Sequence, residues 1–112
     1  MHFSEADFEQ IADKQLKELE EAILLLEKDE IEVDLMSETL TIEVSSQTPI
    51  VINRHRAAKQ IWMSAMRRAW HFDYDPEQRI WKDAKSKDEL VFTLEGILTS
   101  FLGSTVQLRV LK

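Results

Sequence analysis

The chain contains no cysteine, only two glycines and two prolines, and no long apolar run. Without cysteine it cannot form disulfides, thiolate metal sites, cysteine nucleophiles or cysteine-ligated clusters, and this fits a reducing compartment. The two glycines, Gly96 and Gly103, leave no glycine-rich phosphate loop. No apolar run reaches the roughly 18 residues of a membrane span, and the acidic, helical N-terminus is unlike a signal peptide. We therefore expect a cytoplasmic protein that has no membrane partner.

Histidine and serine, which often carry chemistry, are few or badly spaced. His2, His55 and His71 lie far apart and lack the spacing of zinc ligands. Each is expected at the surface or in a turn, with His71 partly packed between its two aromatic neighbours. No serine lies in a nucleophile elbow. An ordinary hydrolytic or redox enzyme is therefore not predicted.

The chain is rich in acidic residues, and they are unevenly distributed. Its 112 residues, a length typical of one domain spanning 1–112, carry a net charge of −7. Residues 1–44 hold 14 acidic and 3 basic residues (−11), whereas residues 45–112 hold 7 and 11 (+4), which together give −7. Opposite signs predict two contact surfaces, and the overall acidity argues against a nucleic-acid partner. The alternative is an acidic helix that only keeps the protein soluble.

Two segments have the pattern of amphipathic helices. The first, at about 4–27, begins at Ser4, which can cap it while Phe3 packs on Phe8. The second follows residues 86–89, which we interpret as a capping box, and Gly103 suits its C-terminal cap. An apolar tail is expected to fold back onto the helices through Val106, Leu108 and Val110.

Between the helices the apolar residues recur with a period of two, which indicates strands. We expect strands near 30–35 and 39–44, two within 49–66, and two more near 70–74 and 79–82. Because no helix separates successive strands, the sheet should be antiparallel. Two helices side by side cover only one face of it. The predicted fold is α+β: a two-layer α-β sandwich with the N- and C-terminal helices on one face of a five- to six-stranded antiparallel sheet.

Trp62 is the first candidate for function. In its strand the residues on either side, Ile61 and Met63, are expected to face the helices. Trp62 then faces outward beside Asn53 and Gln60, and a large aromatic on an open sheet face is a candidate for partner binding. The alternative is that further protein covers this face and buries Trp62.

Carboxylates in the first helix and first strand form the second candidate surface. Oxygen ligands suit hard cations such as ferric iron, calcium or manganese. Alternate strand residues lie about 6.6 Å apart, too far for a tight single-ion site on one strand, so we expect a row of weak, poorly selective sites. The alternative is an edge strand whose charge prevents association between sheets. The candidates are Glu18, Glu20, Glu21, Glu27, Asp29, Glu30, Glu32 and Asp34.

The segment IVINRHRAAKQIWMS, followed by HFDY, the strand IWKD and a closing amphipathic helix, resembles the frataxin family in its bacterial CyaY form. The resemblance covers nearly the whole chain. It implies an α-β sandwich, weak iron binding through carboxylates of the first helix and strand, and a role in iron–sulfur cluster assembly. It also implies contact with the cysteine desulfurase and its scaffold protein.

Site residues follow from the resemblance by position. The acidic ridge of the family is matched by Glu9, Glu20, Glu21, Glu30, Glu32 and Asp34, and the sheet contact surface by Asn53, Arg54, Gln60 and Trp62. His55 joins the predicted partner surface, although it stands where the family usually has Gln. Leu24 and Leu25 replace acidic residues, and MRRAW replaces a glycine-rich loop.

Three functional hypotheses remain. The first is an iron-binding accessory and regulator of iron–sulfur cluster assembly, monomeric without metal, that binds iron weakly as Fe2+ or Fe3+ and other hard divalent cations. The second is a metal-independent protein-interaction module whose acidic helix only solvates it. The third, a ferroxidase, has the least support, because that chemistry usually needs a preorganised di-iron site with His among the carboxylates. We therefore expect an accessory protein and not an enzyme.

Overall fold

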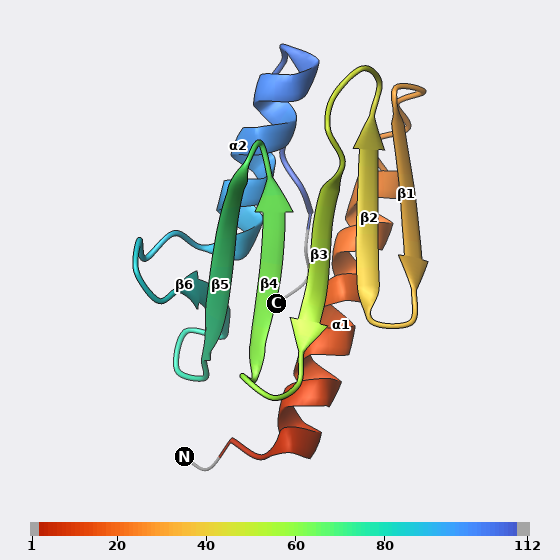
Figure 1. The fold of residues 1–112 in the computed structure, drawn as a ribbon. Helices are drawn as coiled ribbons and strands as arrows, with labels where there is room; N and C mark the ends of the chain where they lie inside the picture. Colours follow the sequence, from red (N-terminus) through yellow and green to blue (C-terminus); the bar gives the residue numbers. More distant parts are fainter. Residues whose placement is uncertain (1–2, 110–112) are drawn as a thin grey trace.

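The structure, a computed structural model, describes residues 3–109. His2 and Val110, for which positions were predicted from the sequence, lie outside that range. The elements are α1 (Glu5–Leu24), β1 (Ile31–Met36), β2 (Thr39–Val44), β3 (Ile50–His55), β4 (Gln60–Ala65), β5 (Arg68–Asp75), β6 (Ile80–Asp83) and α2 (Leu90–Leu102). The strands lie side by side in sequence order, each antiparallel to the next (Figure 1).

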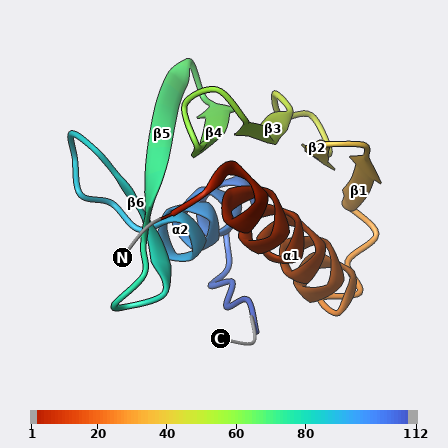
Figure 2. The ribbon, with the colours of Figure 1, turned by 90° about the horizontal axis from the view of Figure 1, so that it is seen from below.

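Both helices cover the same face of the sheet (Figure 2), with α1 against β1–β3 and α2 against β6. Inward-facing strand residues and the apolar stripes of the helices form one buried core between the layers. This confirms the predicted two-layer α-β sandwich and fixes the number of strands at six. Within residues 3–109, neither helix is long and apolar enough to cross a membrane.

Helix α1 begins as predicted. The Ser4 hydroxyl accepts a hydrogen bond from the Asp7 backbone N–H (3.0 Å), the Asp7 carboxylate accepts one from the Ser4 N–H, and Phe3 packs edge-on against Phe8. The helix ends at Leu24, about three residues earlier than expected. Leu24 and Leu25 are 59% and 70% exposed, so they do not pack at the helix end.

Helix α2 begins differently from the prediction. Its cap is Glu89, whose carboxylate accepts hydrogen bonds from the N–H groups of Val91 and Phe92 (2.9 Å each). Ser86 takes part in the preceding turn instead, so the predicted capping box is wrong. Gly103 closes the helix in the left-handed conformation (φ 74°), as predicted.

The C-terminal tail folds back onto α2 as expected. Val106 and Leu108 are buried. The backbone N–H of Val106 donates to the Thr99 hydroxyl (2.9 Å), and that of Leu108 donates to the Glu95 carboxylate (2.7 Å). Side chains of α2 therefore fix the described part of the tail.

Asp83 organises the turn that leads from β6 to α2. One carboxylate oxygen accepts hydrogen bonds from the N–H groups of Lys85 and Ser86 (2.9 Å each), and the other accepts one from the His71 N–H (2.8 Å). Burial raises the pKa of Asp83, but hydrogen bonds, led by that from the Ser86 backbone, lower it more, so the net pKa lies below its usual value.

The hairpin between β4 and β5 turns without glycine. Its two loop residues, Met66 and Arg67, both have positive φ angles (51° and 62°). Two-residue hairpin loops of this kind favour Asn-Gly, because side chains with a Cβ are strained in the left-handed region. The sequence MRRAW therefore builds a strained hairpin tip.

Candidate cation-binding edge and partner-binding face

A group of carboxylates lies where β1 meets β2. Glu32 pairs directly across the ladder with Glu43. Together with Asp29 and Glu30 they line an open hollow of ≈ 420 Å³. Like charges directly opposite each other destabilise a strand pair, and a bound cation would relieve that repulsion. Glu43 was not among the predicted ligands, although the register of a short hairpin around residues 37–38 would have placed it there.

The predicted carboxylates of α1 do not form a single row. Glu9 lies on the flank of α1 that contacts Arg54, and Glu20, three turns further on, lies on the same flank. Glu18 lines a groove of ≈ 520 Å³ between α1 and α2, on the opposite flank. Asp34 continues the outward side of β1, two residues beyond Glu32. Within residues 3–109, no three carboxylate or imidazole groups are arranged to hold one metal ion.

Glu18 differs from the other acidic residues in its surroundings. One of its carboxylate oxygens is buried and has no hydrogen-bond partner. Burial raises its pKa, with a smaller opposing effect from Lys14 and a further increase from Glu21. Glu18 lines the groove between α1 and α2 and does not line the acidic hollow at β1 and β2.

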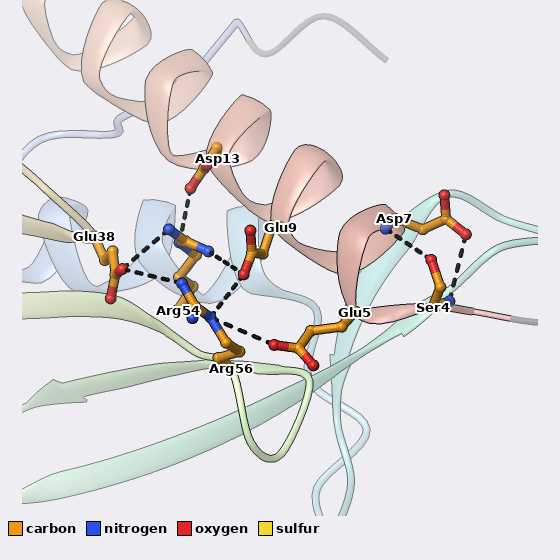
Figure 3. Close-up of polar contacts among 8 residues, drawn as sticks. All are labelled: Ser4, Glu5, Asp7, Glu9, Asp13, Glu38, Arg54 and Arg56. Carbon is orange, nitrogen blue, oxygen red and sulfur yellow. Dashed lines mark hydrogen bonds and ion pairs between the residues drawn. The ribbon is translucent and has the colours of Figure 1, made fainter.

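Two arginines neutralise part of the acidic surface (Figure 3). The guanidinium of Arg54, with a side chain only 10% exposed, lies 2.9 Å from the Asp13 carboxylate, 3.1 Å from Glu38 and 3.5 Å from Glu9. Arg56 lies 2.6 Å from the same Glu9 oxygen and 3.7 Å from Glu5. A metal ion at Glu9 would have to displace these cations, so the predicted ligand Glu9 is already neutralised within the protein.

Arg54 is not a neighbour of Trp62, contrary to our expectation from the sequence. Strand β3 continues to His55, and alternation along it places Arg54 on the same side as the buried Ile50 and Ile52. That side faces α1. The predicted partner surface on the open face therefore keeps Asn53, His55, Gln60 and Trp62, while Arg54 connects the sheet to the helix.

On the open face, Trp62 lies between two histidine rings. The His55 ring stacks on it at 3.9 Å between centroids and 13° between planes, and the His71 ring at 4.3 Å and 19°. His71 is exposed and not packed between its aromatic neighbours, which corrects the expectation from the sequence. Alternation within β5 could have revealed this, since Trp70 and Phe72 both face the core.

Polar contacts hold the Trp62 indole in place. Its N–H donates to the Gln60 amide oxygen (2.8 Å), and the Gln60 amide nitrogen donates to the Asp73 carboxylate (3.0 Å). Asn53 pairs with Trp62 across the β3–β4 ladder. Trp62 is partly exposed, so the face presents a rigid aromatic stack with a polar rim.

Comparisons with known proteins agree with this architecture. A family model described as a frataxin-like domain matches residues 1–104. The iron–sulfur cluster assembly protein CyaY of Pseudomonas fluorescens (strain Pf0-1) is 28% identical over 106 residues, which cover 93% of this chain and 94% of that protein. Frataxin from Psychromonas ingrahamii has a similar structure (TM-score 0.85, 27% identity), covering 93% of this chain and 96% of that one. Trimeric frataxin from the yeast Saccharomyces cerevisiae shares the fold (TM-score 0.74, 21% identity, 84% and 80% covered).

Proposed function

The chain belongs to the frataxin family, CyaY type, and from this premise we propose that it is an accessory protein of iron–sulfur cluster assembly. Its relatives are named iron–sulfur cluster assembly protein CyaY, and on that ground we propose an accessory role in the assembly machinery. The partners we propose are the cysteine desulfurase and its scaffold protein. The cytoplasm is the proposed location.

The observation that carries the proposal is the Trp62 stack on the sheet face opposite the two helices. Both faces of the indole are held by histidine rings and its N–H is held by Gln60. A fixed, half-buried aromatic with a polar rim loses little side-chain entropy on binding, and such residues commonly dominate the energy of an interface. We assign Asn53, His55, Gln60 and Trp62 to the partner contact.

Iron is proposed to bind at the hollow lined by Asp29, Glu30, Glu32 and Glu43. These carboxylates lie in high-dielectric surroundings and do not converge on one point, so binding should be micromolar or weaker and open to competition by other hard cations. Glu20, Glu21, Glu27 and Asp34 would add weaker contacts along the same acidic part of the molecule. Glu9 contributes less, since Arg54 and Arg56 already neutralise it.

A metal-independent interaction module is the second candidate. It is favoured by the absence of three converging ligand groups within residues 3–109. The Trp62 stack is held by ring stacking and a hydrogen bond. The two functions differ in whether iron changes the effect of the protein on its partners.

The experiment is an iron titration of cluster assembly in a reconstituted desulfurase–scaffold mixture, with direct measurement of binding to that complex. Trp62→Ala should weaken binding about thirtyfold, because an aromatic anchor contributes about 2 kcal/mol. Phe92→Ala, which removes an aromatic that is 75% exposed on α2, is the matched control and should bind normally. Normal binding by folded Trp62→Ala would contradict the assignment of the open face.

A second pair of variants separates the two candidates. Glu32→Gln with Glu43→Gln should weaken iron binding roughly tenfold and remove the iron dependence of the assay, since two charges are lost at one hollow. Glu77→Gln with Asp88→Asn removes two exposed charges elsewhere and should change neither. An unchanged iron dependence in the first pair would exclude this hollow as the iron-binding site. No iron response in any variant would favour the metal-independent module.

A further inference from the structure

The outer edge of β5 is unpaired over its first residues. Strand β5 begins at Arg68, but β6 pairs with it only from Phe72 to Asp75. Residues of an antiparallel strand alternate in the edge to which their N–H and C=O groups point. His71 directs both groups to this edge, where they bond to the Asp83 carboxylate and the Ala84 N–H. Ala69, two residues earlier, directs its backbone groups to the same edge, where no strand of the described part of the chain pairs with it.

A hollow of ≈ 440 Å³ lies beside this open edge, lined by residues 68–71 of β5, residues 83–86 of the following turn, and Gln60. Its lining is rich in hydrogen-bond donors and cations. Arg68 and Lys85 are both exposed, and the ion pairs found among residues 3–109 all belong to Arg54 and Arg56. In a chain of net charge −7, this hollow therefore has two cations without carboxylate partners.

Trp70 also lines the hollow. Its side chain is buried (2% exposed), and its indole N–H is shielded from solvent without a hydrogen-bond partner. A buried donor without an acceptor costs free energy. The Arg68 guanidinium lies over the indole ring, 4.6 Å from its centroid, so the positive charge is held next to the unsatisfied donor.

The one carboxylate in the lining, Asp83, does not serve these cations. Both of its oxygens accept backbone N–H groups, from His71, Lys85 and Ser86, at 2.8–2.9 Å. Asp83 is thereby occupied by the turn that it organises. Arg68 and Lys85 therefore have no counter-charge in the hollow, and an oxyanion would supply one.

We propose that this hollow is an oxyanion-binding site, which takes a carboxylate or phosphate group between Arg68 and Lys85, next to the Trp70 indole. The site is distinct from the acidic hollow at β1 and β2. It adjoins the open face through His71, whose ring also stacks on Trp62. It goes beyond the role proposed above and does not depend on iron.

The experiment is a titration of the protein with sodium phosphate and, separately, with sodium acetate, each at constant ionic strength against sodium chloride. The readout is the assigned indole N–H proton resonance of Trp70 in solution NMR. We expect a saturable shift with a midpoint in the millimolar range, typical of a small anion held by exposed charges. If the midpoint is lower for phosphate, the site is assigned to phosphate groups. If the midpoint is lower for acetate, the site is assigned to carboxylates.

Matched variants separate a site from general attraction between charges. Arg68→Gln and Lys85→Gln should each raise the midpoint roughly fivefold, since each loses a charge-assisted contact worth about 1 kcal/mol at an exposed site. Arg67→Gln and Lys87→Gln remove the adjacent charges that do not line the hollow, and their midpoints should stay within about twofold. No saturable shift, or equal losses in lining and non-lining variants, would overturn the proposal.

Discussion

The Asp83 carboxylate connects two separate parts of the chain. It joins β5 to the turn before α2 through three backbone N–H groups. Because the carboxylate is the form that these donors stabilise, its pKa is lowered despite the burial that raises it. The stability of this corner of the fold is therefore linked to the charge state of one residue.

Replacing Asp83 by Asn should lower the free energy of unfolding at neutral pH by about 2 kcal/mol, because an amide NH2 then meets one of the N–H donors. The folded-state pKa of Asp83 lies below its unfolded value. The stabilisation by the carboxylate is therefore complete above the unfolded pKa of about 3.9, and it is lost as pH falls through the folded pKa. Asn does not titrate, so the difference between the two proteins should narrow below about pH 4.

Urea denaturation of both proteins from pH 7 to pH 3 measures this difference directly. Asp88→Asn, a change at an exposed carboxylate nearby, serves as the control and should follow the unmodified protein across the range. A difference between Asp83→Asn and the unmodified protein that stays constant down to pH 3 would contradict the assignment of the lowered pKa to this turn.

At the scale of elements, the β4–β5 hairpin shows the cost of a chain with few glycines. Changing Met66 to Asn and Arg67 to Gly together should raise the free energy of unfolding by about 1 kcal/mol. The change relieves left-handed strain of about 1–2 kcal/mol per residue. Glycine reduces this gain by about 0.5–1 kcal/mol, because it increases the conformational entropy of the unfolded chain. Thermal and urea denaturation measure the gain. Arg67→Gln controls for the lost charge and should leave stability unchanged; a double variant no more stable than this control would contradict the account.

Alternation between apolar and polar residues was sufficient to predict the elements and the two layers. It predicted the outward position of Trp62, because Ile61 and Met63 on either side of it are both buried. It failed where a strand ran further than its apolar residues. Arg54 is predicted to lie on the open sheet surface, yet β3 continues through it and directs it toward α1, where its charge is balanced by acids from α1 and the β1–β2 hairpin that are distant in sequence.

The errors at the two candidate surfaces have a common cause. The pairing of Glu32 with Glu43 depends on hairpin register, and the stacking of His71 on Trp62 depends on register between β4 and β5. Composition alone does not specify register, which the hydrophobic pattern and the geometry of the turns set together. The predicted capping box is wrong because Ser86 belongs to the turn before the helix, where its N–H donates to the Asp83 carboxylate. The assignment of these residues to iron and to partners remains a prediction.

For the molecule as a whole, the charge of −7 should limit stability at low salt. Arg54 and Arg56 balance part of the acidic half, but the hollow formed by Asp29, Glu30, Glu32 and Glu43 has no cation within ion-pair distance among the described residues. The melting temperature should therefore rise with sodium chloride, by about 4 °C or more for each kcal/mol of repulsion screened.

Calcium chloride at equal ionic strength should raise the melting temperature further, because a cation that binds only the folded state stabilises it by mass action. The additional rise should be absent in the protein that carries Glu32→Gln and Glu43→Gln. Scanning calorimetry in matched salts provides the measurement. Equal melting temperatures in both salts would mean that the hollow does not bind the ion.

The sequential order of the six strands has a consequence for how the chain folds. Each strand pairs with its neighbour in sequence, so every hairpin closes a short loop and loses little chain entropy in doing so. Contacts between α1 and β3 are different: the Arg54 guanidinium of β3 lies 2.9 Å from the Asp13 carboxylate of α1, although the two residues are far apart in sequence. Such long closures are slow relative to local pairing. We expect the hairpins to form early and α1 to dock late, so that the acidic helix completes the core only after the sheet exists.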